Sequence, residues 1–399
     1  MPGPLDGFRI VDLTSMLSGP LATSWLGDQG ADVIKVEIPG VGDYTRALGN
    51  RSAGMSVGFL NINRSKRSLT LDVKKADGKA VLERLSATAD VFIQNFRPGV
   101  VERLGIDEAA IRKISPNIVY VSISGFGEEG PLSGQPVYDP IIQALSGLTT
   151  VQAGSDEERP RLVRTILPDK LTAIVAAQAI SSALLVRERT GQGQHVRLSM
   201  LDAVINFLWA SDMGAYTLVD KEVTNQAAAS FIDLIYATSD GYITASTMGN
   251  KEWAALTRAF GRPELLEDPR FKTAADRDRN VNERLALIQE ELLTKTSAEW
   301  LELFNREGVP SAPALTRGEM IEHPQVRANR IVVESEHPIA GRLRQARPAA
   351  RFSGTPAVPP RGAPRLGEHN EELLAELGYA RDDVTKMVSN GSVGSESYS

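Results

Sequence analysis

One carboxylate stands out because it lies at the start of a long apolar helix. The stretch RTILPDKLTAIVAAQAISSALLVRERT, residues 164–190, places Asp169 directly after Pro168 and before the apolar run. Asp is a favoured N-cap residue, since its side chain accepts a hydrogen bond from a free backbone N–H. A helix N-terminus also favours an ionised carboxylate, and such a group can act as a nucleophile. The local pattern therefore allows both a helix cap and a covalent catalyst.

Other kinds of reactive centre find little support in the sequence. The chain contains no cysteine, which excludes thiol nucleophiles, disulfides and thiolate metal sites. Its four histidines lack metal-ligand spacing, so we predict no metal site. The loop SGPLATSWLG stands where a dinucleotide fingerprint would lie but lacks its glycines, and with Glu37 it leaves a nicotinamide-dependent dehydrogenase as a weak alternative. SISGFG, around Ser124, does not match the nucleophile elbow of hydrolases.

Alternating strand and helix patterns predict the scaffold that positions Asp169. The apolar strand candidates are residues 8–15, 32–37, 68–73, 90–96, 117–127 and 195–200. Helical patterns separate most of them, which favours a doubly wound α/β domain with a parallel sheet over residues 1–215. The apolar helix after Asp169 carries polar residues and ends in RERT, so we predict a core helix and no membrane span.

The pattern changes in the middle of the chain. Residues 235–247 indicate two strands joined at Asp240-Gly241, and helices follow at 251–260, 281–293 and 298–307, the last with a Thr296/Glu299 capping box. We predict a smaller α+β domain over residues 230–325. Residues 326–399 are expected to form an extended linker and to return to the large domain with a capped helix at GEHNEELLAELG. The Ser/Gly-rich end after Met387 is expected to be disordered.

Composition limits the classes of partner. The net charge of −6, with 42% hydrophobic and 24% charged residues, is typical of a globular protein. It gives no reason to expect a nucleic acid or an anionic membrane as partner. The start MPGPLDGFRIVDLTS lacks the pattern of a secretory signal, and the absence of cysteine agrees with a cytoplasmic setting.

Several segments, taken together and in order, resemble the class III CoA transferases, the family that includes formyl-CoA and carnitine CoA transferases. They include LDGFRIVDLT, GPLATSWLGDQGADVIKVE, GDYTR, NINRSKRSLTLDVK, ADVFIQNFRPGVVERLG, YVSISGFGEEGP, YDPIIQALSG and ALLVRERTGQGQHVRLSMLDA. The resemblance implies a large Rossmann-like domain built from both chain ends, a smaller inserted domain and an interlocked homodimer. It also implies coenzyme A and acyl-CoA as substrates, a carboxylic acid as acceptor, and no prosthetic group.

The resemblance assigns Asp169 to the position of the family nucleophile. By the family mechanism, Asp169 would attack the acyl-CoA thioester to form a mixed anhydride, and the released CoA thiolate would convert the anhydride into an aspartyl-CoA thioester. The acceptor acid would then take over CoA. Such a covalent relay divides one difficult exchange into easier steps.

The same resemblance implies which residues bind CoA. They fall into groups for the adenine and phosphates, the pantetheine, and the approach to Asp169: Leu17, Ser18, Leu71, Asp72, Val73, Lys74, Asn95, Phe96, Arg97, Arg103, Pro136, Val137, Tyr138 and Asp139. Taken singly and without the resemblance, Lys66, Arg67, Lys74 and Lys75 are more typical of a solvated basic surface.

Departures from the family pattern bear on the substrate. Formyl-CoA transferases have a glutamine at the position of Leu17, an arginine at that of Ile38, and a glycine run where this chain has TASTMGNKEW. We therefore expect an acid that is less polar or larger than formate or oxalate, with Met248 near the site. An α-methylacyl-CoA racemase is the alternative; those relatives have a histidine at the position of Tyr138, and tyrosine is a poor base near neutral pH. A non-catalytic CoA-binding protein is a third possibility.

Overall fold

The computed structural model describes residues 3–221, 233–247, 249–357 and 361–395. By the proximity of its Cα atoms, the chain divides into two compact units. The first unit comprises Met1–Ala229 and Ile331–Ser399, and the second comprises Ser230–Arg330. Asp169 and all of the predicted CoA-binding residues lie in the first unit, whereas Met248 lies outside the described residues.

A six-stranded sheet forms the centre of the first unit, in the order β5-β2-β1-β6-β7-β8. Every neighbouring pair is parallel, so the predicted central parallel sheet is confirmed. The strands are β1 (Arg9–Asp12), β2 (Asp32–Glu37), β5 (Lys66–Thr70), β6 (Val91–Gln94), β7 (Val119–Ser124) and β8 (His195–Ser199). Strand β5 starts at Lys66 and ends at Thr70, earlier than the predicted range of 68–73.

The strand order reverses between β1 and β6. From β1 the chain proceeds outward through β2 to β5, and it then returns to β6 and proceeds the other way through β7 to β8. In open α/β sheets, ligands bind outside the carboxyl ends of the strands at such a switch point. The topology therefore points to the loops that follow β1 and β6.

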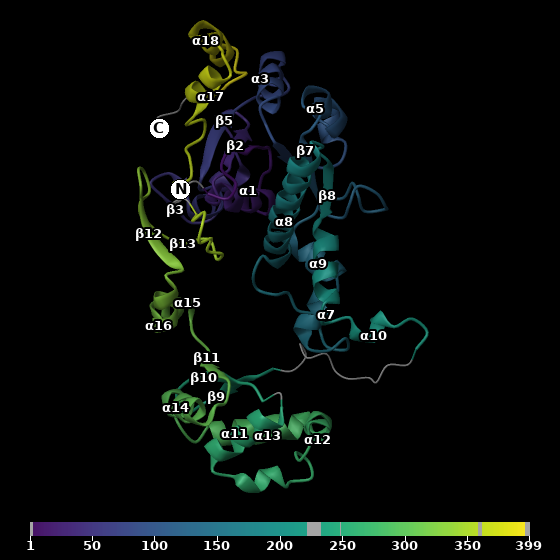
Figure 1. The fold of residues 1–399 in the computed structure, drawn as a ribbon, viewed down its shortest axis with the longest axis vertical. Coiled ribbons are helices and arrows are strands. Elements are labelled where there is room, and N and C mark those ends of the chain that lie inside the picture. Colours follow the sequence, from purple (N-terminus) through teal and green to yellow (C-terminus); the bar gives the residue numbers. More distant parts are fainter. Residues whose placement is uncertain (1–2, 222–232, 248, 358–360, 396–399) are drawn as a thin grey trace. The chain divides into compact units, whose positions relative to one another are not determined.

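Helices cover both faces of the sheet (Figure 1). On one face, α1 (Ser18–Asp28) and α8 (Leu167–Thr190) enclose a core that includes Ile10, Leu26, Val91 and Ile180. The core of the other face combines α3 (Ala76–Ser86), α4 (Val100–Leu104), α5 (Glu108–Ile114), α17 (Asn370–Glu376) and α18 (Arg381–Ser389). Strands buried on both faces are typical of parallel sheets. The end of the chain thus shares a core with its beginning.

Helix α8 is buried along one face only. Its small residues Ala173, Ala176 and Ala183 are buried where it packs against α1 and the sheet, whereas Ile174 and Leu185 are exposed. Among the described residues it is the one helix that is long and apolar enough, by length and composition, to cross a membrane. The prediction of a core helix therefore describes only its buried face, because the opposite face is both apolar and exposed.

The C-terminal segment is ordered further than the sequence predicts. Helix α17 forms in GEHNEELLAELG but has no side-chain cap, and α18 follows it. The predicted disorder after Met387 is wrong for residues 388–395. Val393 forms a bridge with Leu71, and the carbonyl of Ser392 accepts a hydrogen bond from the N–H of Asp72 at 2.9 Å. Pairing with the end of β5 outweighs the flexible composition of this segment.

Shorter elements complete the first unit: η1 (Tyr44–Arg46), β3 (Arg51–Ser52), β4 (Met55–Ser56), α2 (Val57–Ile62), α6 (Asp139–Leu145), α7 (Leu148–Ala153), α9 (Met200–Trp209), α10 (Gly214–Thr217), β12 (Val332–His337) and β13 (Gly341–Ala346).

The second unit combines an antiparallel three-stranded sheet with helices. Its strands are β9 (Ile235–Ala237), β10 (Tyr242–Ala245) and β11 (Ser311–Pro313), and its helical elements are α11 (Asn250–Phe260), η3 (Pro263–Leu266), α12 (Ala274–Arg279), α13 (Val281–Leu292), α14 (Ser297–Glu307), α15 (Arg317–Glu322) and α16 (Pro324–Asn329). Large aromatic side chains, among them Trp253 and Trp300, fill its core. The capping box of Thr296 and Glu299 forms as predicted.

Candidate active site

Asp169 is not the cap of its helix. Helix α8 starts at Leu167, so Asp169 lies within the first turn, and the N-cap residue Ile166 makes no side-chain capping bond. The helix begins upstream of the proline because a proline in the first turn gives up an N–H that has no partner within the helix. The interpretation of Asp169 as a cap is therefore wrong, and its carboxylate is available for other contacts.

Two side chains surround the carboxylate of Asp169. Ser18, the first residue of α1, lies beside this carboxylate, and hydrogen bonding by its N–H and hydroxyl lowers the pKa of Asp169. Burial, followed by the charge of Asp139, raises it more strongly, and the pKa of Asp169 reaches about 6. Burial thus outweighs the helix N-terminus, which was expected to favour the charged form. The result is a poorly solvated carboxylate that is ionised at neutral pH and more basic than an ordinary aspartate.

Asp139 is the first residue of α6 and is 6% exposed. One of its oxygens accepts a hydrogen bond from the N–H of Asp169 at 3.4 Å, and the other accepts one from Nε2 of Gln143 at 2.6 Å. Burial raises the pKa of Asp139, against these two bonds and the charge of Lys170. Gln143 is itself held, since its Oε1 accepts from the N–H of Val163 at 2.9 Å. Gln143 was not predicted as a site residue, although its i,i+4 spacing from Asp139 places both side chains on one face of a helix.

The loops at the switch point are joined by Asn95. Its Oδ1 accepts a hydrogen bond from the N–H of Ser15 at 2.9 Å, and its Nδ2 donates to the carbonyl of Ser15 at 2.8 Å. Asn95 follows β6 and Ser15 follows β1. This paired contact fixes the loop that leads into Leu17 and Ser18.

A close approach places the segment of residues 136–139 beside the end of β7. A Cβ atom on Gly125, the residue after β7, would lie 2.2 Å from Cγ1 of Val137. Only glycine leaves room for this contact. Val137 and Asp139 are thereby held at the same edge of the sheet as the loops after β1 and β6.

The structure brings together part of the predicted site. Ser18, Asp139 and Asp169 are in direct contact, and Asn95 holds the loop that precedes Leu17. Phe96 and Arg97 line a cavity of about 350 Å³ together with Ser122, His195 and Arg197. Leu71 and Asp72 pair with the C-terminal segment, and Val73 packs against the core. Five of the predicted CoA-binding residues are exposed: Lys74, Arg97, Arg103, Pro136 and Tyr138.

Lys66 and Arg67 do not form a solvated basic surface. The side chain of Lys66 is fully buried in an ion pair with Asp12 at 3.0 Å. Burial lowers the pKa of Lys66 to about 8, although Asp12 raises it. The pKa of Asp12 falls to about 2 because Lys66 and Lys35 outweigh the effect of burial. Arg67, 9% exposed, pairs with acidic residues of β2 and α17: Asp32, Glu372 and Glu376.

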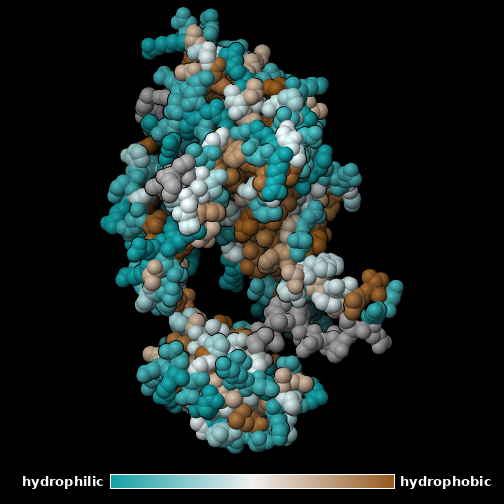
Figure 2. Space-filling model, viewed as in Figure 1, coloured by the Kyte–Doolittle hydropathy of each residue, from teal (hydrophilic) through white to brown (hydrophobic). Residues whose placement is uncertain are grey.

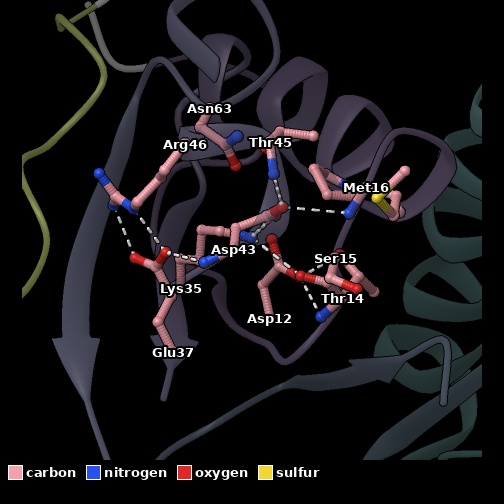
Figure 3. Close-up of polar contacts among 12 residues, drawn as sticks. Asp12, Thr14, Ser15, Met16, Lys35, Glu37, Asp43, Thr45, Arg46 and Asn63 are labelled. Atoms are coloured by element: carbon pink, nitrogen blue, oxygen red, sulfur yellow. Dashed lines mark hydrogen bonds and ion pairs between the residues drawn. The ribbon is translucent and has the colours of Figure 1, made fainter. Parts of the chain in front are cut away.

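A second group of buried charges was also missed (Figure 3). Lys35 on β2 forms an ion pair with Asp43 at 2.8 Å, and both side chains are almost completely buried. Glu37 pairs with Arg46 at 2.7 Å and accepts a hydrogen bond from the N–H of Asp43. The available signal was charge inside an apolar strand, DVIKVE, and the segment GDYTR. Within the described residues, no group of three possible metal-ligating side chains is found.

Comparison with known proteins decides the family. The family model described as CoA-transferase family III matches residues 5–370. The chain belongs to CoA-transferase family III. It is 33% identical to succinyl-CoA:glutarate CoA-transferase of Mus musculus over 97% of this chain and 90% of that protein. It is 35% identical to acetyl-CoA:oxalate CoA-transferase of Acetobacter aceti, with 94% of this chain and 96% of the relative covered.

Solved structures agree with this family III assignment. The orthorhombic form of Rv3272 from Mycobacterium tuberculosis has a TM-score of 0.82 and 33% identity, covering 94% of this chain and 99% of that one. A CAIB/BAIF family protein from Brucella suis has a TM-score of 0.80 and 31% identity, with coverage of 94% and 100%. The resemblance noted in the sequence is thus confirmed at the level of family.

Proposed function

We propose that this family III CoA-transferase moves CoA from an acyl-CoA to a carboxylic acid and that Asp169 carries the CoA covalently. The observation that carries the proposal is the state of Asp169: a poorly solvated carboxylate, bonded to Ser18, that does not cap its helix. The names of the relatives support the reaction class, since they pair an acyl-CoA with a carboxylic acid.

The proposed relay has four steps. A carboxylate oxygen of Asp169 attacks the thioester carbonyl of the donor, which forms a mixed anhydride and releases CoA thiolate. The thiolate attacks the aspartyl carbonyl, and the donor acid departs with one oxygen from Asp169. The acceptor carboxylate then attacks the aspartyl-CoA thioester and again releases the thiolate. Attack of the thiolate on the acceptor acyl carbon forms the new acyl-CoA and restores Asp169.

The surroundings of Asp169 suit this relay. Partial desolvation makes the carboxylate a stronger base and hence a better nucleophile for a thioester. The bonds from Ser18 hold it in one orientation, which favours attack from a fixed geometry. Asp139 sits where a negative charge disfavours a second anion, so it helps to expel the carboxylate product.

We assign the CoA contacts as the family resemblance implies. Lys74, Arg97 and Arg103 are exposed basic residues that follow β5 and β6, and cations of this kind bind phosphates. Tyr138, 62% exposed, lies next to the buried Asp139 and would follow the pantetheine. For the acceptor we retain the prediction of an acid less polar or larger than formate or oxalate, because Leu17 occupies the position of a polar glutamine.

We also propose an interlocked homodimer, with the first unit as the CoA-binding domain and the second as the inserted domain. Large apolar side chains are exposed on α6, α8 and α9: Ile141, Leu145, Ile174, Leu185, Val186, Ile205, Phe207 and Trp209. Figure 2 shows hydrophobic residues gathered over α8 and α9. Continuous apolar surface of this kind marks an interface. A second copy of the chain is the partner that the family resemblance implies, and a cytoplasmic setting stays a prediction.

A panel of donors and acceptors tests the reaction. Acetyl-CoA and succinyl-CoA, each with glutarate, oxalate or a branched acid, should produce new acyl-CoA species by mass, with ping-pong kinetics. The same reactions in deuterated water separate the alternatives. Rapid labelling at the α-carbon of a 2-methylacyl-CoA without CoA exchange would indicate a racemase. Binding of CoA without turnover of any pair would indicate a non-catalytic protein.

A further inference from the structure

A left-handed backbone corner immediately precedes the residue that contacts Asp169. Met16 has a φ of 70°, which is uncommon for a residue with a side chain. It lies two positions before Ser18. The backbone N–H groups of residues 14, 15 and 16 donate to side-chain oxygens at 2.9, 2.9 and 3.2 Å: those of the nearby Asp12 and of the more distant Asn95 and Asp43.

The buried ion pair of Lys35 and Asp43 holds this corner from two sides (Figure 3). Oδ1 of Asp43 accepts the bond from the N–H of Met16, while its other oxygen pairs with Nζ of Lys35 at 2.8 Å. The same Nζ donates to the carbonyl of Thr14 at 2.9 Å. The carboxylate of Asp43 and the ammonium group of Lys35 therefore hold the two ends of the short segment from Thr14 to Met16.

Stability alone is a weak explanation for such a pair. Burying two charges costs desolvation, and an apolar pair of similar volume often stabilises a fold as well. A backbone outlier next to a reactive group, in contrast, supports a hypothesis about function. Here the outlier lies two residues before the N-terminus of α1, where Ser18 lies beside Asp169 and lowers its pKa by hydrogen bonding.

We propose that Asp43 and Lys35 are positioning residues that keep Met16 left-handed and so aim the N–H and hydroxyl of Ser18 at Asp169. Neither residue touches the substrate; both act through the loop. The inference rests on the proposed function in one respect, since it takes Asp169 as the nucleophile. It predicts that loss of Asp43 weakens the bonds from Ser18, and that Asp169 then ionises at a higher pH.

The charged groups around Asp169 and Asp43 determine the pH range in which the proposal can be tested. Asp169 faces Asp139, and the Lys35–Asp43 pair faces Asp12 and Glu37, with Lys66 and Arg46 beyond them. The lowered pKa of Lys66 is about 8. Between about pH 5 and pH 7.5, below that value, the buried network keeps its charge.

The test compares Asp43→Ala, Asp43→Asn and Asp28→Ala. Asn keeps an oxygen for the N–H of Met16 but loses the charge. Asp28 is a matched control: it is fully buried, it pairs with Arg64 at 2.7 Å, and it ends the same helix that Ser18 begins. The first readout needs no activity. It is the pH above which the stability difference between each variant and its Asp169→Asn double variant stops growing, because this upper end marks the pKa of Asp169 in the folded state. The second readout is the acid limb of kcat/KM.

Positioning predicts that Asp43→Ala moves both readouts to higher pH by about one unit and lowers kcat about tenfold, with KM for the acyl-CoA unchanged. Asp43→Asn should lose stability yet keep the acid limb of kcat/KM at its wild-type pH. Asp28→Ala should do the same. If Asp43→Ala loses only stability, as the control does, Asp43 is structural and the proposal fails.

Two further outcomes are informative. Should Asp43→Ala not fold, Met16→Val perturbs the corner without touching the ion pair, because a β-branched residue disfavours positive φ most strongly. It should then move the limb in the same direction, and an unmoved limb would overturn the proposal. If the stability readout shifts while the wild type exchanges no CoA, the proposed function fails and the positioning role stands.

Discussion

Replacing Asp169 by asparagine should stabilise the protein while it abolishes transfer. The pKa of Asp169 rises from its ordinary value of 3.8 to about 6 in the fold, chiefly through burial. Since one pKa unit corresponds to about 1.4 kcal/mol, the ionised carboxylate costs the folded state up to about 3 kcal/mol. This cost is already net of the bonds from Ser18, because they are included in the pKa shift; a neutral amide of the same shape should therefore give a gain of about 1–3 kcal/mol.

The pH dependence gives the sign of this effect. The folded state holds the proton of Asp169 more tightly than the unfolded chain does, so wild type loses stability relative to the variant as pH rises from about 4 to about 6. Thermal unfolding should therefore show a Tm for Asp169→Asn that is a few degrees higher at pH 7.5 and equal near pH 4. Asp202→Asn is the control, since Asp202 is an exposed residue in the first turn of α9. A Tm for Asp169→Asn that is equal or lower at pH 7.5 would show that the ionised carboxylate does not destabilise the fold.

Three other predictions concern activity, CoA binding and assembly. The kcat/KM for acyl-CoA should fall about tenfold per pH unit below about pH 6, because protonation of Asp169 removes the nucleophile; a flat profile down to pH 5 would contradict this. Arg103→Ala and Lys74→Ala should each weaken CoA binding in calorimetry about tenfold or more, since a charge-assisted phosphate contact contributes about 1.5–3 kcal/mol, with Tm unchanged. Wild-type affinity in both variants would show that the assigned CoA site is wrong. Light scattering at nanomolar concentration should give a mass near twice 43.2 kDa, and an active monomer would exclude the interlocked dimer.

Local sequence patterns predicted the bounds of helices and strands better than the contacts between distant segments. Strand β2 matches its predicted range because a short apolar run is a local signal. The predicted start of α8 is wrong because the first turn of a helix can accommodate a proline. The pairing of Val393 with Leu71 was missed because no local pattern encodes contacts between distant segments.

The candidate site was predictable only in part, for the same reason. The ordered motifs identified Asp169, Ser18 and Asp139, which the structure places in contact. Residue type alone assigned Lys66 and Arg67 to the surface, because charged side chains are rarely buried without a partner. Their partners, Asp12 and Asp32, lie more than thirty residues away in the chain. Buried polar networks of this kind become visible only once the fold is known.

Isotope transfer tests the covalent relay most directly. Turnover with an acceptor acid labelled with oxygen-18 in its carboxylate should leave one labelled oxygen on Asp169, because the acceptor oxygen stays with the aspartate when CoA thiolate attacks the acceptor acyl carbon. Trypsin releases Asp169 in the peptide Thr165–Lys170, where it is the only acidic side chain, and Asp139 lies in a different peptide. Label should appear in this peptide after turnover of the wild type and be absent from the peptide of Asp169→Asn. Efficient CoA exchange with no label in Thr165–Lys170 would contradict the assignment of Asp169 as the carrier.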